Sequence, residues 1–186
     1  MNYRILQYDK LDSTNDQAIA FAKDGAADGT VVVADFQTKG RGQFERTWIS
    51  PRGKGLLFSI LLRPKLNANE APILTQVAAE AVAEMLKDKF NLPATIKKPN
   101  DVLVQRKKIA GILTESSTVG NQLEYVVIGI GLNVTSNAKE LLETATSIAI
   151  ETKSKPKKEE ILLDLLGVFN QKYRKLYTTK KAQIHA

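Results

Sequence analysis

A glycine- and arginine-rich segment, residues 40–56, contains the residue types that bind anions in proteins. It holds four glycines, four lysine or arginine residues and the only tryptophan of the chain, Trp48. Glycine lets backbone N–H groups approach a ligand closely, and the cations add positive charge beside them. Trp48 offers a flat apolar face on which a base can stack. The segment favours a bound phosphate or adenylate, although a surface loop anchored by a buried tryptophan has the same composition.

Four further blocks accompany this segment. They are Asp-Ser-Thr-Asn at residues 12–15 together with Gln37, Lys-Lys-Pro-Asn-Asp at 97–101, Lys-Lys-Ile-Ala-Gly-Ile-Leu-Thr-Glu at 107–115, and Ile-Gly-Ile-Gly-Leu-Asn-Val at 128–134. In this order the blocks resemble the catalytic domain of the biotin protein ligases, which attach biotin to carboxyl-carrier domains. The resemblance covers residues 6–134.

The resemblance implies an ATP-dependent reaction in two steps. The carboxylate of biotin attacks the α-phosphate of ATP, giving biotinyl-5′-AMP and pyrophosphate. The mixed anhydride then acylates a lysine of a biotin carboxyl-carrier protein domain, of the acetyl-CoA or pyruvate carboxylase type. Both steps require anions to be neutralised and aligned. The matching cations are Lys108, Arg41 and Arg46, although Lys108 read alone could be a solvated turn lysine.

The ureido ring of biotin requires hydrogen-bond donors and acceptors at fixed positions, which hydroxyl and amide side chains supply. By the resemblance, Thr14, Asn15 and Gln37 are its polar partners, and glycines form the walls of a narrow site. Ser13 could serve only as the N-cap of the helix that follows it. The full set implied for biotin is Ser13, Thr14, Asn15, Gln37, Gly40, Arg41, Lys108, Gly111, Ile112 and Gly129.

The resemblance assigns a second set of residues to ATP and the adenylate. Trp48 and Asn133 would enclose the adenine, although Asn133 could equally be a turn residue at a strand end. Asn100 and Asp101 would hold Mg²⁺, which prefers oxygen ligands. Read alone, Pro-Asn-Asp is a common turn. The nucleotide set is Arg41, Gly42, Gln43, Arg46, Trp48, Asn100, Lys108 and Asn133.

The chain departs from the family pattern at three positions. Gln43 stands where an arginine is typical, Glu45 where a glycine is typical, and Lys98 where a tryptophan is typical. A neutral amide holds a phosphate less strongly than a guanidinium does, so these changes affect retention of the adenylate more than its formation. We expect residues 1–186 to form one catalytic domain, with no N-terminal DNA-binding domain and no small C-terminal β-barrel.

Two other functions stay open on this sequence. A ligase or transferase that uses lipoate or octanoate has the same fold, and a polar ureido site at Thr14, Asn15 and Gln37 favours biotin over it. A catalytically weak biotin-binding or regulatory protein is the other alternative. Gln43 and the missing domain favour that interpretation.

Composition limits the chemistry and the location. The 186 residues are 43% hydrophobic and 25% charged, which is typical of a globular domain. The chain has no cysteine, and therefore no disulfide and no thiolate metal site. It has no signal-peptide core and no apolar run of membrane length, which predicts a cytoplasmic protein without membrane contact. The net charge of +7 raises nucleic acid as a partner, but the cations are spread along the chain and we expect none.

Hydrophobic periodicity predicts an α+β (mixed α/β) domain with one mixed sheet packed by helices. The resemblance makes it the class II aminoacyl-tRNA synthetase-like fold of the biotin and lipoate ligases. Strands are expected at residues 3–8, 30–36, 56–62, 94–97, 102–104, 108–116 and 123–130, and helices at 13–23, at 71–90 and after Pro156. Such a sheet has free edge strands, so we expect a homodimer that pairs them.

Overall fold

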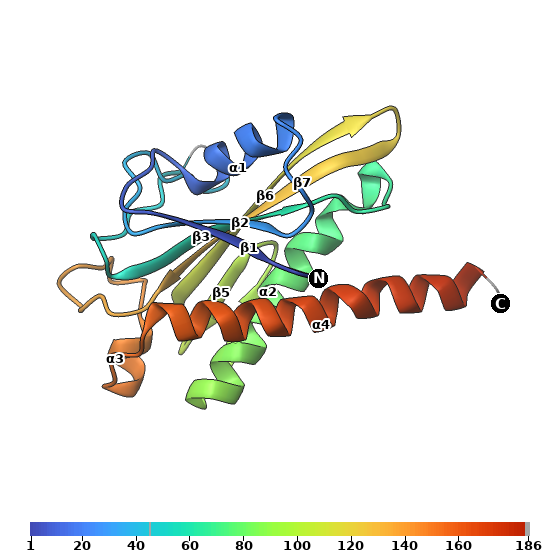
Figure 1. The fold of residues 1–186 in the computed structure, drawn as a ribbon. Helices are drawn as coiled ribbons and strands as arrows, with labels where there is room; N and C mark the ends of the chain where they lie inside the picture. Colours follow the sequence, from blue (N-terminus) through green and yellow to red (C-terminus); the bar gives the residue numbers. More distant parts are fainter. Residues whose placement is uncertain (45, 185–186) are drawn as a thin grey trace.

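A seven-stranded mixed sheet in the order β1-β2-β3-β7-β6-β5-β4 organises the computed structural model (Figure 1). The model describes residues 1–44 and 46–184, with side chains as far as residue 176, so Glu45 lies outside the described residues. Strands β1 and β2 run parallel, and the other neighbouring pairs are antiparallel. The strands are β1 (Arg4–Tyr8), β2 (Thr30–Ala34), β3 (Gly55–Leu62), β4 (Ala94–Lys97), β5 (Asp101–Val104), β6 (Lys107–Val119) and β7 (Gln122–Asn133).

Helices cover both faces of the sheet. Helix α1 lies on one face, and α2 and α4 lie together on the other (Figure 1). Among the described residues, none of the helices combines the length and the apolar character needed to cross a membrane. The helices are α1 (Thr14–Lys23), the 3₁₀ turn η1 (Ala68–Glu70), α2 (Ala71–Phe90), α3 (Ile148–Thr152) and α4 (Lys158–Ile184).

Strand β3 shows how this three-layer arrangement follows from the sequence. Side chains alternate between the two faces of a strand, so a strand covered on both sides is apolar almost throughout. Leu56, Phe58 and Ile60 belong to the main core under α2 and α4. Leu61 points the other way and packs with the alanines of α1. All of β3 is buried, and Ser59 is its one polar side chain.

The predicted mixed sheet packed by helices is confirmed. The observed bounds of α2 and β4 match the predicted ranges, and Gly120 and Asn121 form the turn between β6 and β7. Helix α1 begins at Thr14 because Ser13 is its N-cap, with its side chain accepting from the Asp16 N–H at 3.4 Å. Helix α3 and the turn η1 were not predicted, since elements this short have no measurable periodicity.

A bulge in β6 decides which way Lys108 points. Asp101 and Leu103 lie on one face of β5 and pair with Gly111 and Lys108 of β6, which leaves Ile109 as the extra residue between the paired positions. Strict alternation would place residues 108 and 111 on opposite faces. The bulge cancels that offset and brings both onto the same face.

Candidate functional site

One cleft, with a volume of about 1010 Å³, gathers almost every residue that the sequence singled out. Gly40 is the exception and lies buried beside it, where a Cβ atom would stand 2.5 Å from the Trp48 carbonyl oxygen. The predicted residues that line the cleft are Ser13, Thr14, Asn15, Gln37, Arg41, Gly42, Gln43, Arg46, Trp48, Asn100, Asp101, Lys108, Gly111, Ile112, Gly129 and Asn133.

A buried polar cluster occupies one end of the cleft. The first turn of α1 supplies Thr14, whose N–H and hydroxyl both donate to Gln37 Oε1, at 2.7 and 2.9 Å. The Ser59 hydroxyl lies 2.8 Å from Thr14 Oγ1 and 2.6 Å from Asn15 Oδ1. The amide oxygen of Gln37 is therefore occupied while its NH₂ group remains a donor, so the cluster can bind a polar ring that accepts hydrogen bonds.

A pair of glycines forms the floor next to this cluster. Gly111 of β6 and Gly131 of β7 are cross-strand partners, and the indole of Trp48 lies on them. A Cβ atom would stand 2.4 Å from Trp48 Cε2 at Gly131 and 3.0 Å from Trp48 Cζ3 at Gly111. Gly129 was predicted as a wall for biotin. The structure places the Asn15 side chain against it, because a Cβ there would lie 2.1 Å from Asn15 Oδ1.

The glycine-rich segment forms a small hairpin over the cleft. The Trp48 N–H donates to the Gly40 carbonyl at 2.9 Å, and the Gly42 N–H donates to the Arg46 carbonyl at 2.7 Å. Between these bonds, Arg41 is bridged to Thr47 in antiparallel fashion. The indole and the Arg41 side chain are therefore held by one short stretch of paired backbone.

Arg41 is engaged by two carboxylates. It donates to Glu115 Oε1 at 2.9 Å and to Glu115 Oε2 at 2.8 Å, and it lies 2.5 Å from Asp16 Oδ1. Partial burial disfavours the charged guanidinium, but the hydrogen bonds and charges of Glu115 and Asp16 outweigh it and raise the pKa of Arg41. Its charge is permanent and already compensated in this arrangement.

Lys108 lies at the centre of a positively charged wall. Its Nζ is 2.7 Å from Asp101 Oδ1 and 5.3 Å from the centre of the Trp48 ring, within the range of a cation–π contact. Seven described side chains of the lining are lysine or arginine and two are acidic, so the cleft favours anionic ligands. The cations are Arg41, Arg46, Lys97, Lys98, Arg106, Lys108 and Lys139, and the acids are Asp101 and Glu140.

Two asparagines predicted to bind the nucleotide also hold backbone. The Asn100 amide donates to the Ile112 carbonyl at 2.8 Å, and the Asn133 amide donates to the Thr146 carbonyl at 3.0 Å. Both side chains therefore face the cleft region with their oxygens as the remaining acceptors. Asn133 ends β7 and is buried, so its role at the strand end is observed and its contact with adenine stays a prediction.

Several cleft residues were not predicted from the sequence. Gly131 could have been found, because it shares a strand face with Gly129 two positions earlier. Ser59, which lies next to the lining and bonds to Thr14 and Asn15, could have been found as the one hydroxyl inside an apolar strand. The segment 139–145 carried no signal, since its place beside Lys108, through Thr144 and Ala145, depends on the folded chain.

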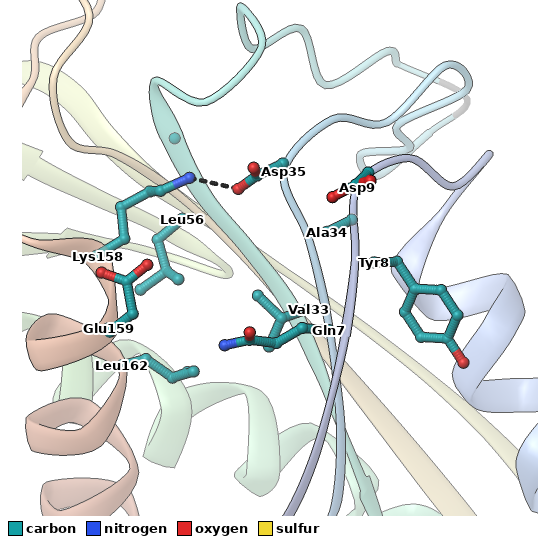
Figure 2. A pocket seen from close by; sticks show the side chains of 11 residues that line it. Gln7, Tyr8, Asp9, Val33, Ala34, Asp35, Leu56, Lys158, Glu159 and Leu162 are labelled. Carbon is teal, nitrogen blue, oxygen red and sulfur yellow. Dashed lines mark hydrogen bonds and ion pairs between the residues drawn. The ribbon is translucent and has the colours of Figure 1, made fainter.

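A second, smaller cavity of about 370 Å³ lies between β1, β2, β3 and the start of α4. Figure 2 shows Lys158 reaching across it to Asp35, with Nζ 2.6 Å from Oδ1. None of the predicted site residues lines this cavity. Because the predicted site residues line the larger cleft, we assign the chemistry to that cleft.

Comparison with known proteins agrees with the cleft geometry. Residues 9–133 match the model of the biotin/lipoate A/B protein ligase family. The bifunctional ligase/repressor BirA of Bacillus subtilis is 36% identical over 182 residues, which are 96% of this chain and 56% of that protein. The biotin--[acetyl-CoA-carboxylase] ligase of Paracoccus denitrificans is 39% identical over 127 residues, which are 67% of this chain and 52% of that protein. The chain thus spans about half the length of these curated relatives.

Solved structures resemble the whole fold. The biotin protein ligase of Aquifex aeolicus in complex with biotin and ATP superposes with a TM-score of 0.79 at 32% identity, over 92% of this chain and 71% of that one. The matched family model contains the glycine-rich segment and the blocks around Lys108 and Asn133. The chain belongs to the biotin/lipoate A/B protein ligase family.

We predict that Gly131→Ala displaces Trp48, because the added methyl group and the indole cannot share the same space. Overpacking of this kind costs about 1–3 kcal/mol, measurable by urea denaturation, and quenching of Trp48 by acrylamide should rise. Gly167→Ala in α4 is the control, since nothing lies within 4 Å of its Cβ position. Removing a helical glycine should stabilise by about 0.5–1 kcal/mol, so the two variants shift in opposite directions. Unchanged quenching in Gly131→Ala would contradict the packing described.

Proposed function

We propose that this chain is the catalytic domain of an ATP-dependent biotin protein ligase. The observation that carries the proposal is the continuity of one cleft from the polar cluster around Gln37 to the cationic wall around Lys108. A ligand with a polar ring at one end and an anionic group at the other fits a cleft that is polar at one end and positively charged at the other. Relatives named as biotin ligases, and one solved with biotin and ATP, support the same assignment.

The adenylation step follows from the charges in the cleft. A carboxylate oxygen of biotin attacks the α-phosphorus, the P–O bond to the β-phosphate breaks, and pyrophosphate leaves. Two anions must approach each other, so Lys108 and Arg46 lower the barrier by neutralising charge at the reacting atoms. Lys108 is suited to this role because its flexible ammonium can turn from Asp101 towards the developing charge.

The second step needs no covalent enzyme intermediate. The amine of a lysine on a biotin carboxyl-carrier protein domain attacks the acyl carbon of biotinyl-AMP. The carbon–oxygen bond to the phosphate breaks, AMP leaves, and the amine loses a proton. We propose that the carrier docks where Phe44 and Leu142, two exposed apolar side chains, line the cleft.

The residues proposed for Mg²⁺ fit a cation held jointly with phosphates. Asn100 keeps a free amide oxygen while its NH₂ donates to Ile112, and the adjacent Asp101 supplies a carboxylate. In the described part of the chain no three acidic, histidine or cysteine side chains gather, and Mg²⁺ commonly takes one or two protein oxygens plus water and phosphate. When bound, the ion would add positive charge beside the phosphates of ATP.

The polar cluster favours biotin over lipoate or octanoate. Thr14, Asn15 and Gln37 place three hydrogen-bonding side chains at the end of the cleft, and Ser59 bonds to two of them. Burying an aliphatic tail against this end would leave the Gln37 NH₂ group without an acceptor. We also propose that residues 1–186 act as one catalytic domain, and that the protein works in the cytoplasm, where ATP is supplied.

We predict that Lys108→Ala reduces adenylate formation on the order of 10²- to 10³-fold, because one preorganised positive group is lost from the transition state. Pyrophosphate release from biotin and ATP measures this step in wild type and variant. Biotin affinity should fall less, as calorimetry would show. The matched control is Lys107→Ala, since Lys107 is exposed and outside the cleft lining. Wild-type protein that releases no pyrophosphate with biotin would refute the proposed function, and an active Lys108→Ala would remove Lys108 from the mechanism.

We predict that Gln43→Arg slows dissociation of biotinyl-AMP by about 5- to 150-fold, the ratio that corresponds to roughly 1–3 kcal/mol for charge-assisted bonds. The wild type should accordingly label bystander proteins more than the variant does. Arg52 is not among the residues that line the cleft, and its guanidinium lies over the Phe36 ring, 5.0 Å from the centroid. Arg46 is the remaining substitute. Equal dissociation rates would show that Arg46 already holds the phosphate.

We predict a homodimer, because both edges of the sheet, β1 and β4, have an unpaired side. The pairing of β5 also ends at Gly111, so β6 beyond Gly111 has only β7 as a strand partner. Light scattering at micromolar concentration, with and without biotin and ATP, should give twice the mass of the chain. A monomer under all these conditions would contradict the prediction.

A further inference from the structure

We propose that Glu115 is a positioning residue that joins the glycine-rich hairpin to the buried polar cluster. Its carboxylate contacts two elements that are remote in sequence, the hairpin through Arg41 and the first turn of α1 through Asn15. Glu115 would serve the proposed biotin ligation, and in this respect the inference rests on the proposed function. The contacts themselves are independent of it.

Both oxygens of Glu115 are in use. Oε1 accepts from Arg41 Nη1 at 2.9 Å, while Oε2 accepts from Arg41 Nη2 at 2.8 Å and from Asn15 Nδ2 at 2.7 Å. Bidentate, charge-assisted pairs of this geometry are stronger and more directional than single contacts. The side chain of Glu115 is 27% exposed, so water screens the pair only partly. The pair between Lys39 and Asp12, at 75% and 58% exposure, is of the weaker surface type.

Glu115 sets the orientation of the Asn15 amide. A carboxylate can only accept, so the NH₂ group of Asn15 must face it, and the amide oxygen is directed to Ser59. The same NH₂ group also donates to the Leu113 carbonyl at 3.2 Å, and Gly129 leaves room for this side chain. Loss of the carboxylate would leave the amide orientation to this longer bond, and the order of donors and acceptors in the polar cluster would be held less firmly.

On the other side, Glu115 fixes the hairpin that carries Trp48. Arg41 and Thr47 form an antiparallel backbone bridge. Next to it, the Trp48 N–H donates to the Gly40 carbonyl at 2.9 Å. The indole then returns to β6 by lying on Gly111, four residues before Glu115. Glu115, Arg41, Trp48 and Gly111 thus form a closed set of contacts, in which Glu115 attaches the hairpin to β6 on the side of Arg41.

The same geometry changes the role of Arg41. Glu115 and Asp16 together compensate its charge, so it anchors the hairpin, and the charge that faces a phosphate comes from Lys108, Arg46 and the other lining cations. Arg41 was predicted as a catalytic cation from the family resemblance. We assign it instead, with Glu115, to positioning.

The test uses the single tryptophan of the chain, which sits in the hairpin. In Glu115→Gln without ligands, acrylamide quenching of Trp48 should rise, because a neutral amide cannot hold both Arg41 nitrogens and Asn15. The matched control is Glu124→Gln, which alters an exposed carboxylate of β7 that accepts from Ser117 at 2.9 Å. Its quenching should equal that of wild type, and circular dichroism should match for all three proteins.

Kinetics give a second readout that loss of stability alone would not produce. KM for biotin should rise on the order of 10-fold in Glu115→Gln, with a smaller change in kcat, because the ligand site is disordered while Lys108 remains. Arg41→Gln probes the same contact from a side chain outside the core and should give the same quenching. In the double variant the effects should not add, as expected for groups that act as one unit.

Unchanged quenching in both single variants, or additive effects on KM, would overturn the proposal. If Glu115→Gln does not fold, Arg41→Gln alone decides, since its side chain is 41% exposed and its loss leaves no cavity in the core. The quenching experiment contains no biotin and no ATP. A protein that failed the pyrophosphate assay would therefore refute the proposed function while leaving the positioning role to be decided by quenching.

Discussion

The cleft depends on the close approach of side chains to bare backbone on two neighbouring strands. Gly111, Gly129 and Gly131 lie on one face of β6 and β7, and the space of their missing side chains is taken by Trp48 and Asn15. Glycine inside a strand is unfavourable for strand stability, so such a cluster indicates a close contact that the fold requires. The sheet provides a rigid surface, and a loop and a helix that lie on it supply further residues of the cleft lining.

Charge is distributed around this surface in two different ways. Arg41 is held by Glu115 and Asp16, whereas the cations along β4, β5 and the start of β6 line an open wall with few acids. A compensated cation gives directional hydrogen bonds and little net field, and a group of cations that outnumbers its acids gives a field that attracts phosphates. The first arrangement suits positioning, and the second suits binding of two mutually repelling anions.

The sequence predicted those parts of the molecule whose causes are local. Helix α2 had a long apolar periodicity, and its range was predicted from that periodicity alone. The residues that line the cleft were predicted as blocks, because the blocks in this order resemble a known family. The direction of Lys108 was not accessible, since the bulge at Ile109 exists only through pairing with β5. The contact of Glu115 with Arg41, 74 residues away, depends on the whole sheet order.

In the proposed reaction Asp101 would have two competing roles. Its carboxylate oxygen is 2.7 Å from Lys108 Nζ, and Asp101 follows Asn100 in the chain, so the same group pairs with the lysine and could supply an oxygen ligand to a cation. A carboxylate that held Mg²⁺ would have less charge to offer the ammonium, so one role weakens the other. Under the proposed function, Lys108 would be restrained by Asp101 in the free protein and would face the phosphate when Asp101 holds a cation.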